Sequence, residues 1–153
     1  KNEYIQECLI RQMNSHIFKK YYIAIVDGIL TEKSAIIDAP ISRKENSIIE
    51  RCINENGDKA ITNYFVINEF NNNSLTYITL QTGRTHQIRV HMSYIGHPIS
   101  GDTLYGKKSN FINRQALHAC KVCFIHPLTK QKMSIEADLP DDIKNFLYSN
   151  YTM

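Results

Sequence analysis

The segment "GRTHQIRVHMSYIGHPISGD", residues 83–102, places many basic or titratable side chains among apolar ones. These side chains belong to Arg84, His86, Arg89, His91 and His97. A guanidinium does not lose its proton in a protein, so an arginine packed among apolar residues requires an anionic partner or a water-filled cleft. The segment therefore predicts a site for an anion, either a carboxylate of the protein or a phosphate of a ligand.

The same segment predicts a helix over residues 85–95, because Thr85 is a candidate N-cap and Gly96 is a natural C-terminal stop. Two apolar patches should cover opposite sides of this helix, formed by Ile88, Met92 and Ile95 and by Val90 and Tyr94. Between them lies a polar stripe made of His86, Arg89 and Ser93. A helix that is apolar on two sides is packed on two sides, so Arg89 should point into a partly enclosed space.

Each of these cationic residues also has a structural alternative. Arg89 could be paired within the protein, with a carbonyl or a distant aspartate. Arg84 stands at the helix start, where free N–H groups bind phosphates well, but it could equally be a solvated surface arginine. His86 and His91 lie five residues apart on different helix faces without a glutamate between them, so packing or RNA contact is favoured over metal binding.

The composition is that of a globular protein of 153 residues with a formal net charge of +3, which permits nucleic acid as a partner but does not require it. We find no apolar run that could cross a bilayer and no signal peptide, so we expect a cytoplasmic protein without a membrane partner. The four cysteines are then expected to be free thiols. Cys120 and Cys123 form a CxxC motif, but a strand would turn them to opposite sides, which disfavours a zinc or redox site.

Strands outnumber helices along the chain. We expect helices through about Met13 and over residues 141–150, where Asp141 is a possible cap. A strand is expected at residues 19–28. One or two short strands are expected within residues 29–41, where Pro40 should stop them. Two hairpins should join 60–70 to 74–83 and 117–127 to 130–140. This order predicts an α+β fold with a mixed, largely antiparallel sheet and a few flanking helices.

Beyond these patterns, "LQTGRTHQIRVHMSYIGHPISGDTLYG" resembles the signature block of the RluA-type pseudouridine synthases, which isomerise uridine to pseudouridine in ribosomal or transfer RNA. Three further segments resemble other blocks of the family in the same order: "KKYYIAIVDG", "GDKAITNY" and "LHACKVCFIHPLTKQKMSIEADLPDD". Together the four segments cover nearly the whole chain. The resemblance implies the pseudouridine synthase fold and RNA as the partner.

The resemblance also implies roles for individual residues. Tyr22 would be the tyrosine that stacks on the flipped uracil and takes the C5 proton, and Arg89 would pair with the catalytic aspartate. Lys20 would be a supporting basic residue beside the cleft. The adjoining wall, with possible RNA contacts, would be formed by Arg84, Thr85, His86 and Gln87. No metal or organic cofactor is implied.

The sequence departs from the family pattern in one respect. The family's nucleophilic aspartate lies in an H-R-L-D-x-x-T-S-G segment upstream of the strand that carries Tyr22, and these 153 residues contain no such segment. Asp102, in "SGDTLYG", matches a family aspartate that looks structural. Residues 1–153 are therefore expected to be the C-terminal portion of a catalytic domain and inactive alone. Arg89 should be solvated, paired with another group or disordered, which leaves Arg84 as the better candidate for RNA contact.

Two alternatives remain open. The chain could be a non-catalytic RNA-binding module that uses the same cleft, or one chain of a split enzyme whose other chain supplies the aspartate.

Overall fold

The computed structural model describes residues 2–151, and side chains up to residue 149. Its centre is a six-stranded sheet in the order β2-β5-β6-β1-β7-β8, in which every pairing is antiparallel. The strands of this sheet are β1 (Lys19–Asp27), β2 (Ser34–Asp38), β5 (Ile61–Phe70), β6 (Asn73–Leu80), β7 (Leu117–Ile125) and β8 (Lys132–Glu136). The remaining elements are a small hairpin of β3 (Ile41–Arg43) and β4 (Arg51–Ile53) and the helices α1 (Glu3–Asn14), α2 (Gln87–Tyr94) and α3 (Asp141–Tyr151). The expected α+β fold is confirmed.

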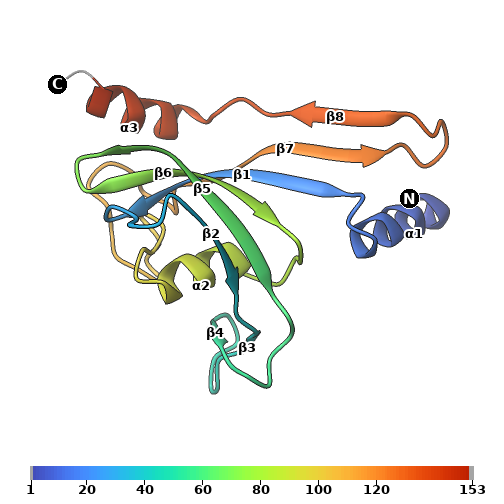
Figure 1. Cartoon of the computed structure of the whole chain (residues 1–153), viewed down its shortest axis with the longest axis horizontal. Helices are drawn as coiled ribbons and strands as arrows, with labels where there is room; N and C mark the ends of the chain where they lie inside the picture. Colours follow the sequence, from blue (N-terminus) through green and yellow to red (C-terminus); the bar gives the residue numbers. More distant parts are fainter. Residues whose placement is uncertain (1, 152–153) are drawn as a thin grey trace.

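Both predicted hairpins of the large sheet are present. The β5–β6 turn uses Asn71 and Asn72 at φ of 43° and 61°, a left-handed conformation that asparagine tolerates better than most residues. The β7–β8 turn includes Lys130 at φ 61°. The small β3–β4 hairpin was not predicted, and it projects from the body of the molecule below α2 (Figure 1).

Helix α2 covers one face of the sheet. The register places Tyr64, Ile78 and Tyr22 in one row across β5, β6 and β1. Thr62, two residues before Tyr64 and therefore on the same face, is hydrogen-bonded to α2. In Figure 1, α2 lies below the strands and α3 above them.

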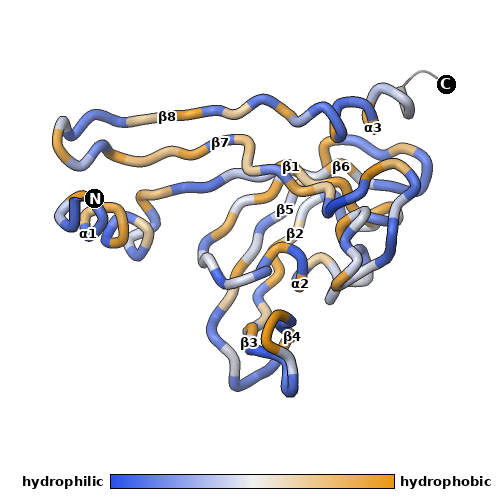
Figure 2. The backbone as a smooth tube through the Cα atoms, turned by 180° about the vertical axis from the view of Figure 1, so that it is seen from behind, coloured by the Kyte–Doolittle hydropathy of each residue, from blue (hydrophilic) through white to orange (hydrophobic). Residues whose placement is uncertain are grey.

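The core lies where the central strands meet α2 and α3. Ile25 and Ile78 from the sheet, Met92 from α2 and Ile143 from α3 have no exposed surface. Hydrophobic stretches also gather where β1 and β6 converge (Figure 2). No helix within residues 2–151 is long and apolar enough to span a membrane.

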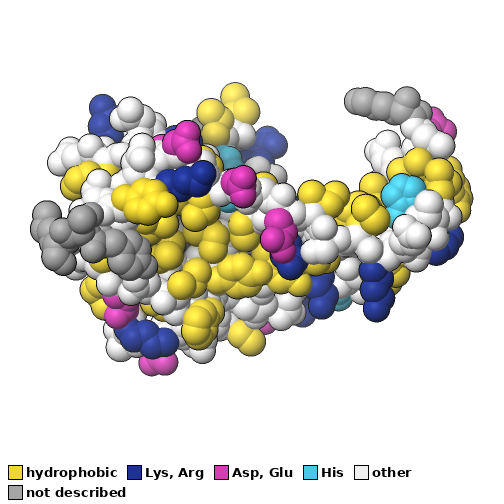
Figure 3. Space-filling view, turned by 90° about the horizontal axis from the view of Figure 1, so that it is seen from above, with side chains coloured by type: hydrophobic (Ala, Val, Ile, Leu, Met, Phe, Trp, Pro, Cys, Tyr) yellow, Lys and Arg dark blue, Asp and Glu magenta, His cyan; other side chains and the backbone are white. Residues whose placement is uncertain are grey.

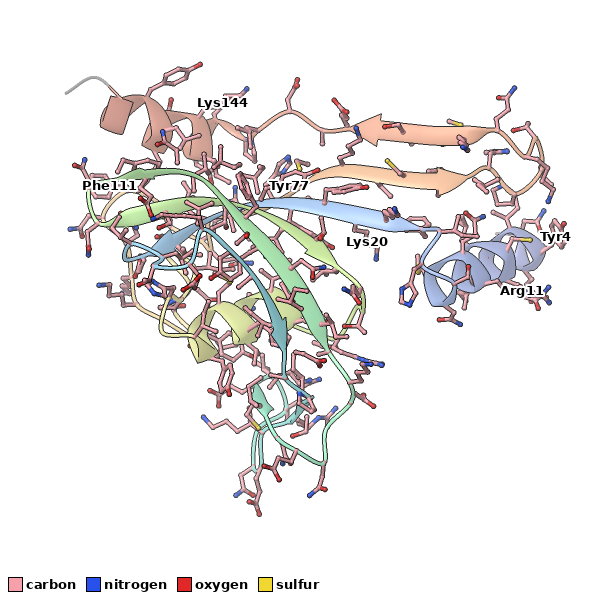
Figure 4. All side chains as sticks on the ribbon, in the orientation of Figure 1. Tyr4, Arg11, Lys20, Tyr77, Phe111 and Lys144 are labelled. Carbon is pink, nitrogen blue, oxygen red and sulfur yellow. The ribbon has the colours of Figure 1, made fainter. Side chains whose placement is uncertain are left out.

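Strands β7 and β8 extend as an arm toward α1, which lies beside the outer ends of β1 and β7 (Figure 1). The side-chain amide of Gln12 donates to the carbonyl of Ile125 at 2.7 Å and accepts the Ile125 N–H at 2.8 Å, as a neighbouring strand would. No residue of α1 is buried, and Tyr4 and Arg11 project outward (Figure 4). This helix is thus held mainly at its C-terminal end.

Candidate active site

The start of α2 is formed differently from the prediction. The helix begins at Gln87, and the preceding His86 adopts a left-handed conformation with φ 59° and makes no side-chain cap. The prediction of Thr85 as the N-cap is therefore wrong, because His86 occupies that position. The Gln87 side chain accepts the N–H of Arg84 at 2.9 Å. The C-terminal end agrees with the prediction, since Gly96 follows the helix at φ 85°.

Gln87 anchors α2 to the sheet. Its carbonyl oxygen accepts from the Thr82 hydroxyl as well as from the Arg84 N–H, and its NH₂ group donates to the carbonyl of Ile61 and to Thr62 Oγ1. The residue is only 2% exposed. Because both ends of the amide are already bonded within the protein, this geometry gives Gln87 a structural part and leaves it no free group for RNA.

His91 ties α2 to β5 and to the segment between β2 and β3. Its Nε2 lies 2.9 Å from the carbonyl of Ala39, which can only accept, so Nε2 carries the proton. Its Nδ1 then accepts the hydroxyl hydrogen of Thr62 at 2.9 Å. Burial lowers the pKa of His91, which is consistent with a neutral ring. His91 thus has a packing role, one of the two roles favoured from the sequence.

Arg89 is paired with a carboxylate of this chain, one of the alternatives that the sequence left open. Its Nε and Nη2 donate to the two oxygens of Asp102 at 2.6 and 2.7 Å. The Asp102 side chain is 0% exposed and that of Arg89 is 16% exposed. Burial by itself would raise the pKa of Asp102, but the hydrogen bonds from Arg89 and the Leu104 N–H outweigh it and lower that pKa.

The polar stripe of α2 faces the turn that carries Asp102. The ring of Tyr105 lies 4.9 Å from the guanidinium carbon of Arg89. The Tyr105 hydroxyl accepts the N–H of Arg51 and lies 2.8 Å from Nδ1 of His86. Ser93 donates its hydroxyl to the carbonyl of Tyr105. All three residues of the stripe therefore contact one short turn, which sequence spacing did not identify as their partner.

Of the two predicted apolar patches of α2, one is packed as expected and the other only in part. Ile88 and Met92 are buried in the main core, and Ile95 packs against it. Val90 is 4% exposed and forms a small second core with two residues of neighbouring segments, Ile41 and Ala60. Tyr94 is 61% exposed, so the expectation that it is packed beside Val90 is wrong.

Tyr22 and Lys20 line a hollow of about 350 Å³ beside β1, β7 and β8. Tyr22 lies on the same face of the sheet as α2. Burial raises the pKa of the Tyr22 hydroxyl. Lys20, labelled in Figure 4, places its Nζ 5.7 Å from the ring of Phe18. The neighbouring Tyr21 points to the other face of β1 and stacks on Tyr77 at 5.7 Å between ring centres. The hollow thus combines an aromatic ring with a cation.

A β-bulge in β7 lies directly opposite Tyr22. Lys121 pairs with Tyr21 and Ala119 pairs with Tyr22, so Cys120 has no partner on β1. Bulges re-aim side chains and are frequent beside active sites. The Sγ of Cys120 lies near the carbonyl of Tyr21, whereas that of Cys123 lies near Ser134 on β8. The two cysteines therefore contact different strands.

The expected RNA-contacting wall is partly exposed. Arg84 and Thr85 lie at the surface, and Arg84 donates through Nε to the carbonyl of Lys59 at 3.0 Å. Its Nη1 lies 3.9 Å from a carboxylate oxygen of Asp58. On the face shown in Figure 3, lysine and arginine side chains are scattered around a broad hydrophobic area rather than gathered into one patch.

The sequence-predicted residues thus fall into two groups. Tyr22 and Lys20 share the hollow on β1, while the other five cluster at the start of α2: Arg84, Thr85, His86, Gln87 and Arg89. Within residues 2–151, no hydrogen bond, ion pair or ring contact joins the two groups. Sequence reasoning missed the pairing of Asp102 with Arg89 and the part played by Tyr105, both in the quoted "SGDTLYG" block.

Comparison with known proteins gives one consistent result. A family model described as RNA pseudouridylate synthase matches residues 1–94. The chain is 42% identical over 147 residues to "Uncharacterized RNA pseudouridine synthase YjbO" of Bacillus subtilis, covering 96% of this chain and 52% of that protein. It is 40% identical over 148 residues to "Ribosomal large subunit pseudouridine synthase D" of Nitrosomonas europaea, covering 91% of this chain and 43% of that protein. The chain spans about half the length of these relatives.

Among solved structures, human RNA pseudouridylate synthase domain containing 1 has the same fold, with a TM-score of 0.78 at 22% identity. The superposition covers 99% of this chain and 73% of that one. The residues matched by the family model include the strand that carries Tyr22 and the helix that carries Arg89. The chain belongs to the RNA pseudouridylate synthase family.

Proposed function

We propose that the intact protein carrying this chain isomerises uridine to pseudouridine in ribosomal or transfer RNA, in the cytoplasm. The observation that carries this proposal is the hollow in which Tyr22 and Lys20 lie side by side, in a chain of this family. A uridine must leave its stack before its base can be turned, so its site needs an aromatic platform and a cationic surround. The Tyr22 ring offers the platform and Lys20 offers a cation.

In the proposed reaction, a carboxylate from outside these 153 residues attacks the nucleoside, and Arg89 holds that carboxylate. The carboxylate oxygen bonds to the sugar carbon as the bond between that carbon and N1 breaks, and the base turns on Tyr22. A new bond then joins C5 to the same sugar carbon as the carboxylate leaves. The C5 proton then leaves and N1 gains one, so the product is an isomer of the substrate. Residues 1–153 alone should not catalyse, because they contain no H-R-L-D segment.

Release of tritium from RNA labelled at uridine C5 tests this function. The intact protein should release tritium, whereas the 153-residue chain and the intact Arg89→Ala variant should release none above background. Turnover by the 153-residue chain would show that a residue within it is the nucleophile and would contradict the assignment. No turnover by the intact protein on any ribosomal or transfer RNA would contradict the function itself.

The exposure of Arg84 and Thr85 favours a second function, RNA binding without catalysis. A filter-binding titration with salt tests it, because several phosphate contacts give a steep loss of affinity as salt rises. Binding by the 153-residue chain alone would support it, and no binding at low salt would remove it. A split enzyme would instead be supported by a separate chain that carries the H-R-L-D segment, and an in-frame upstream H-R-L-D segment would exclude it.

A further inference from the structure

We propose that Asp102 is a positioning residue: it binds the Nε–Nη2 edge of the Arg89 guanidinium so that the neighbouring Nη1–Nη2 edge is presented to the nucleophilic carboxylate. This inference rests on the proposed function, in which that carboxylate comes from outside these 153 residues. It assigns to Asp102 a part in the reaction that goes beyond holding its own turn together.

The donor inventory of Arg89 leaves one edge free. A guanidinium has five N–H groups in a fixed planar fork, and Asp102 uses only Nε–H and one hydrogen of Nη2. Within residues 2–151, no group accepts a hydrogen bond from Nη1 of Arg89. Nη1 is also not among the buried atoms without a partner, so it reaches solvent. The edge formed by Nη1 and Nη2 can therefore receive a second carboxylate in a bidentate fashion.

A second arginine–aspartate pair shows what a purely structural arrangement looks like. Arg114 donates through Nε and Nη2 to the two oxygens of Asp142 at 2.7 and 2.8 Å, the same bidentate geometry. Its Nη1, however, is occupied by the carbonyls of Gln115 and Leu117. Arg89 differs from Arg114 in the one respect that matters for binding another anion.

Asp102 is itself held rigidly. Its Oδ1 accepts the N–H groups of Leu104 and Tyr105 at 3.0 and 3.2 Å in addition to the Arg89 bond. Its side chain has no exposed surface. The preceding Gly101 has φ 77°, a conformation that turns the chain sharply and that side chains disfavour. A carboxylate fixed in this way transfers its orientation to the guanidinium that it binds.

Tyr105 fixes the plane of the guanidinium, because its ring lies 4.9 Å from the guanidinium carbon. The Tyr105 ring is in turn tied through its hydroxyl to the Arg51 N–H and to His86. Asp102 thus holds one edge of the Arg89 guanidinium and Tyr105 covers one face. Together these two contacts set the direction of the free Nη1–Nη2 edge.

The pairing also changes the charge that the second carboxylate meets. With Asp102 ionised, the Arg89 charge is already matched, so the nucleophile would bind mainly through directed hydrogen bonds. Without Asp102, the full cation would stabilise the nucleophile's ionised form more strongly and lower its pKa. The other titratable groups around the pair are His86 on the turn before α2, Tyr105 beside it and Arg51 on β4.

The test compares Asp102→Asn with Asp142→Asn, its matched control, in the intact enzyme by C5-tritium release. We expect Asp102→Asn to lower kcat about 10- to 100-fold, in line with the loss of other orienting contacts. We also expect the acidic limb of its kcat/KM profile to move about one to two pH units lower, the size expected for one charge at close range. Asp142→Asn should keep both the rate and the position of that limb.

Each outcome bears on one proposal. An inactive wild-type enzyme contradicts the proposed function, whatever the variants do. If wild type is active and Arg89→Ala is not, but Asp102→Asn matches Asp142→Asn in rate and pH profile, the positioning role is wrong. A rate increase in Asp102→Asn would also overturn it, because Asp102 would then be competing with the nucleophile for Arg89.

If Asp102→Asn does not fold, side-chain NMR of the wild-type enzyme decides. The Nε–H signal of Arg89, assigned with Arg89→Lys, should exchange slowly with water both with and without bound RNA, because the bond to Asp102 persists. Fast exchange of this hydrogen in the RNA complex would show that Arg89 leaves Asp102 when the site is engaged, and would overturn the proposal.

Discussion

Replacing Thr62 with valine should detach α2 from the sheet at its strongest polar link. Thr62 has no exposed surface, and its hydroxyl donates to Nδ1 of His91 at 2.9 Å and accepts from the Gln87 amide at 3.0 Å. Valine has nearly the same shape but neither bond. Both partners would then lie buried with one group unsatisfied, because Gln87 is 2% and His91 0% exposed.

The expected size follows from these two partners. Leaving one buried polar group unsatisfied costs about 1–3 kcal/mol. Gln87 and His91 keep their other hydrogen bonds, so we take about 1–2 kcal/mol for each, and Thr62→Val should lower the free energy of unfolding by about 2–4 kcal/mol. At a urea dependence of about 2 kcal/mol per M, the midpoint of unfolding should fall by about 1–2 M. Far-UV circular dichroism of the intact protein in urea measures the midpoint, and hydrogen exchange shows whether the amides of α2 lose protection first.

Thr76→Val is the matched control. Thr76 is also fully buried on the sheet, and its hydroxyl donates only to the carbonyl of Ala24 at 3.0 Å. A central-strand carbonyl that loses one of two possible donors is penalised less, so this variant should cost about 0–1 kcal/mol. Equal midpoint shifts for Thr62→Val and Thr76→Val would refute the reasoning that the Thr62 hydroxyl anchors α2.

Four further outcomes are expected. Gly101→Ala should lower the free energy of unfolding in urea by more than about 1 kcal/mol, because φ is 77° and a methyl group would meet a backbone carbonyl. Gly83→Ala is the control and should be nearly neutral, because no atom lies within 4 Å of the added carbon. Equal losses of stability in the two variants would contradict this prediction. Burial lowers the pKa of His91, so below about pH 6.5 the unfolded chain binds a proton that the folded chain resists. The urea midpoint should therefore fall between pH 7.5 and 5.5, more in wild type than in His91→Asn, and identical slopes would exclude this cause. Tyr22→Phe should retain RNA affinity but lose C5-tritium release, whereas Tyr22→Ala should lose both; full turnover by Tyr22→Phe would exclude a part for the hydroxyl. Arg84→Ala should reduce the slope of log affinity against log salt by about 1, and an unchanged slope would remove Arg84 from the phosphate contacts.

Most of the large sheet and its hairpins could be predicted because alternation and turn residues are local signals. The first residues of α2 and α3 could not be predicted in this way. The start of α2 depends on the Gln87 side chain reaching back to the Arg84 N–H. In α3, Asp141 is already the first helical residue, and the first helical hydrogen bond runs from the Lys144 N–H to the carbonyl of Pro140, so Asp141 is not the cap.

The sequence pointed to the residues of the candidate site, but it did not show which of them contact one another. The pattern around Arg89 required an anion, and several aspartates could have supplied it. The choice of Asp102 follows from a turn at Gly101 that brings the carboxylate back under α2, which spacing along the sequence does not reveal. The exposure of Tyr94 was missed for a similar reason, because a helix-face pattern does not show where the neighbouring segments end.

Cys120, which has no partner on β1, lets β7 change its length without turning Tyr22 away from its neighbours. Lys121 and Ala119 face Tyr21 and Tyr22 as consecutive residues of a regular strand would. Losing the single codon for Cys120 would leave the other cross-strand pairs of β1 and β7 in place, and it would remove the local twist of the bulge and the hydrogen bond from the Ala137 N–H to the Cys120 carbonyl. Losing a paired residue such as Val122 with no new bulge would turn the rest of the strand over. Cys120 is therefore where this strand can gain or lose one residue during evolution while Tyr22 keeps its cross-strand neighbours.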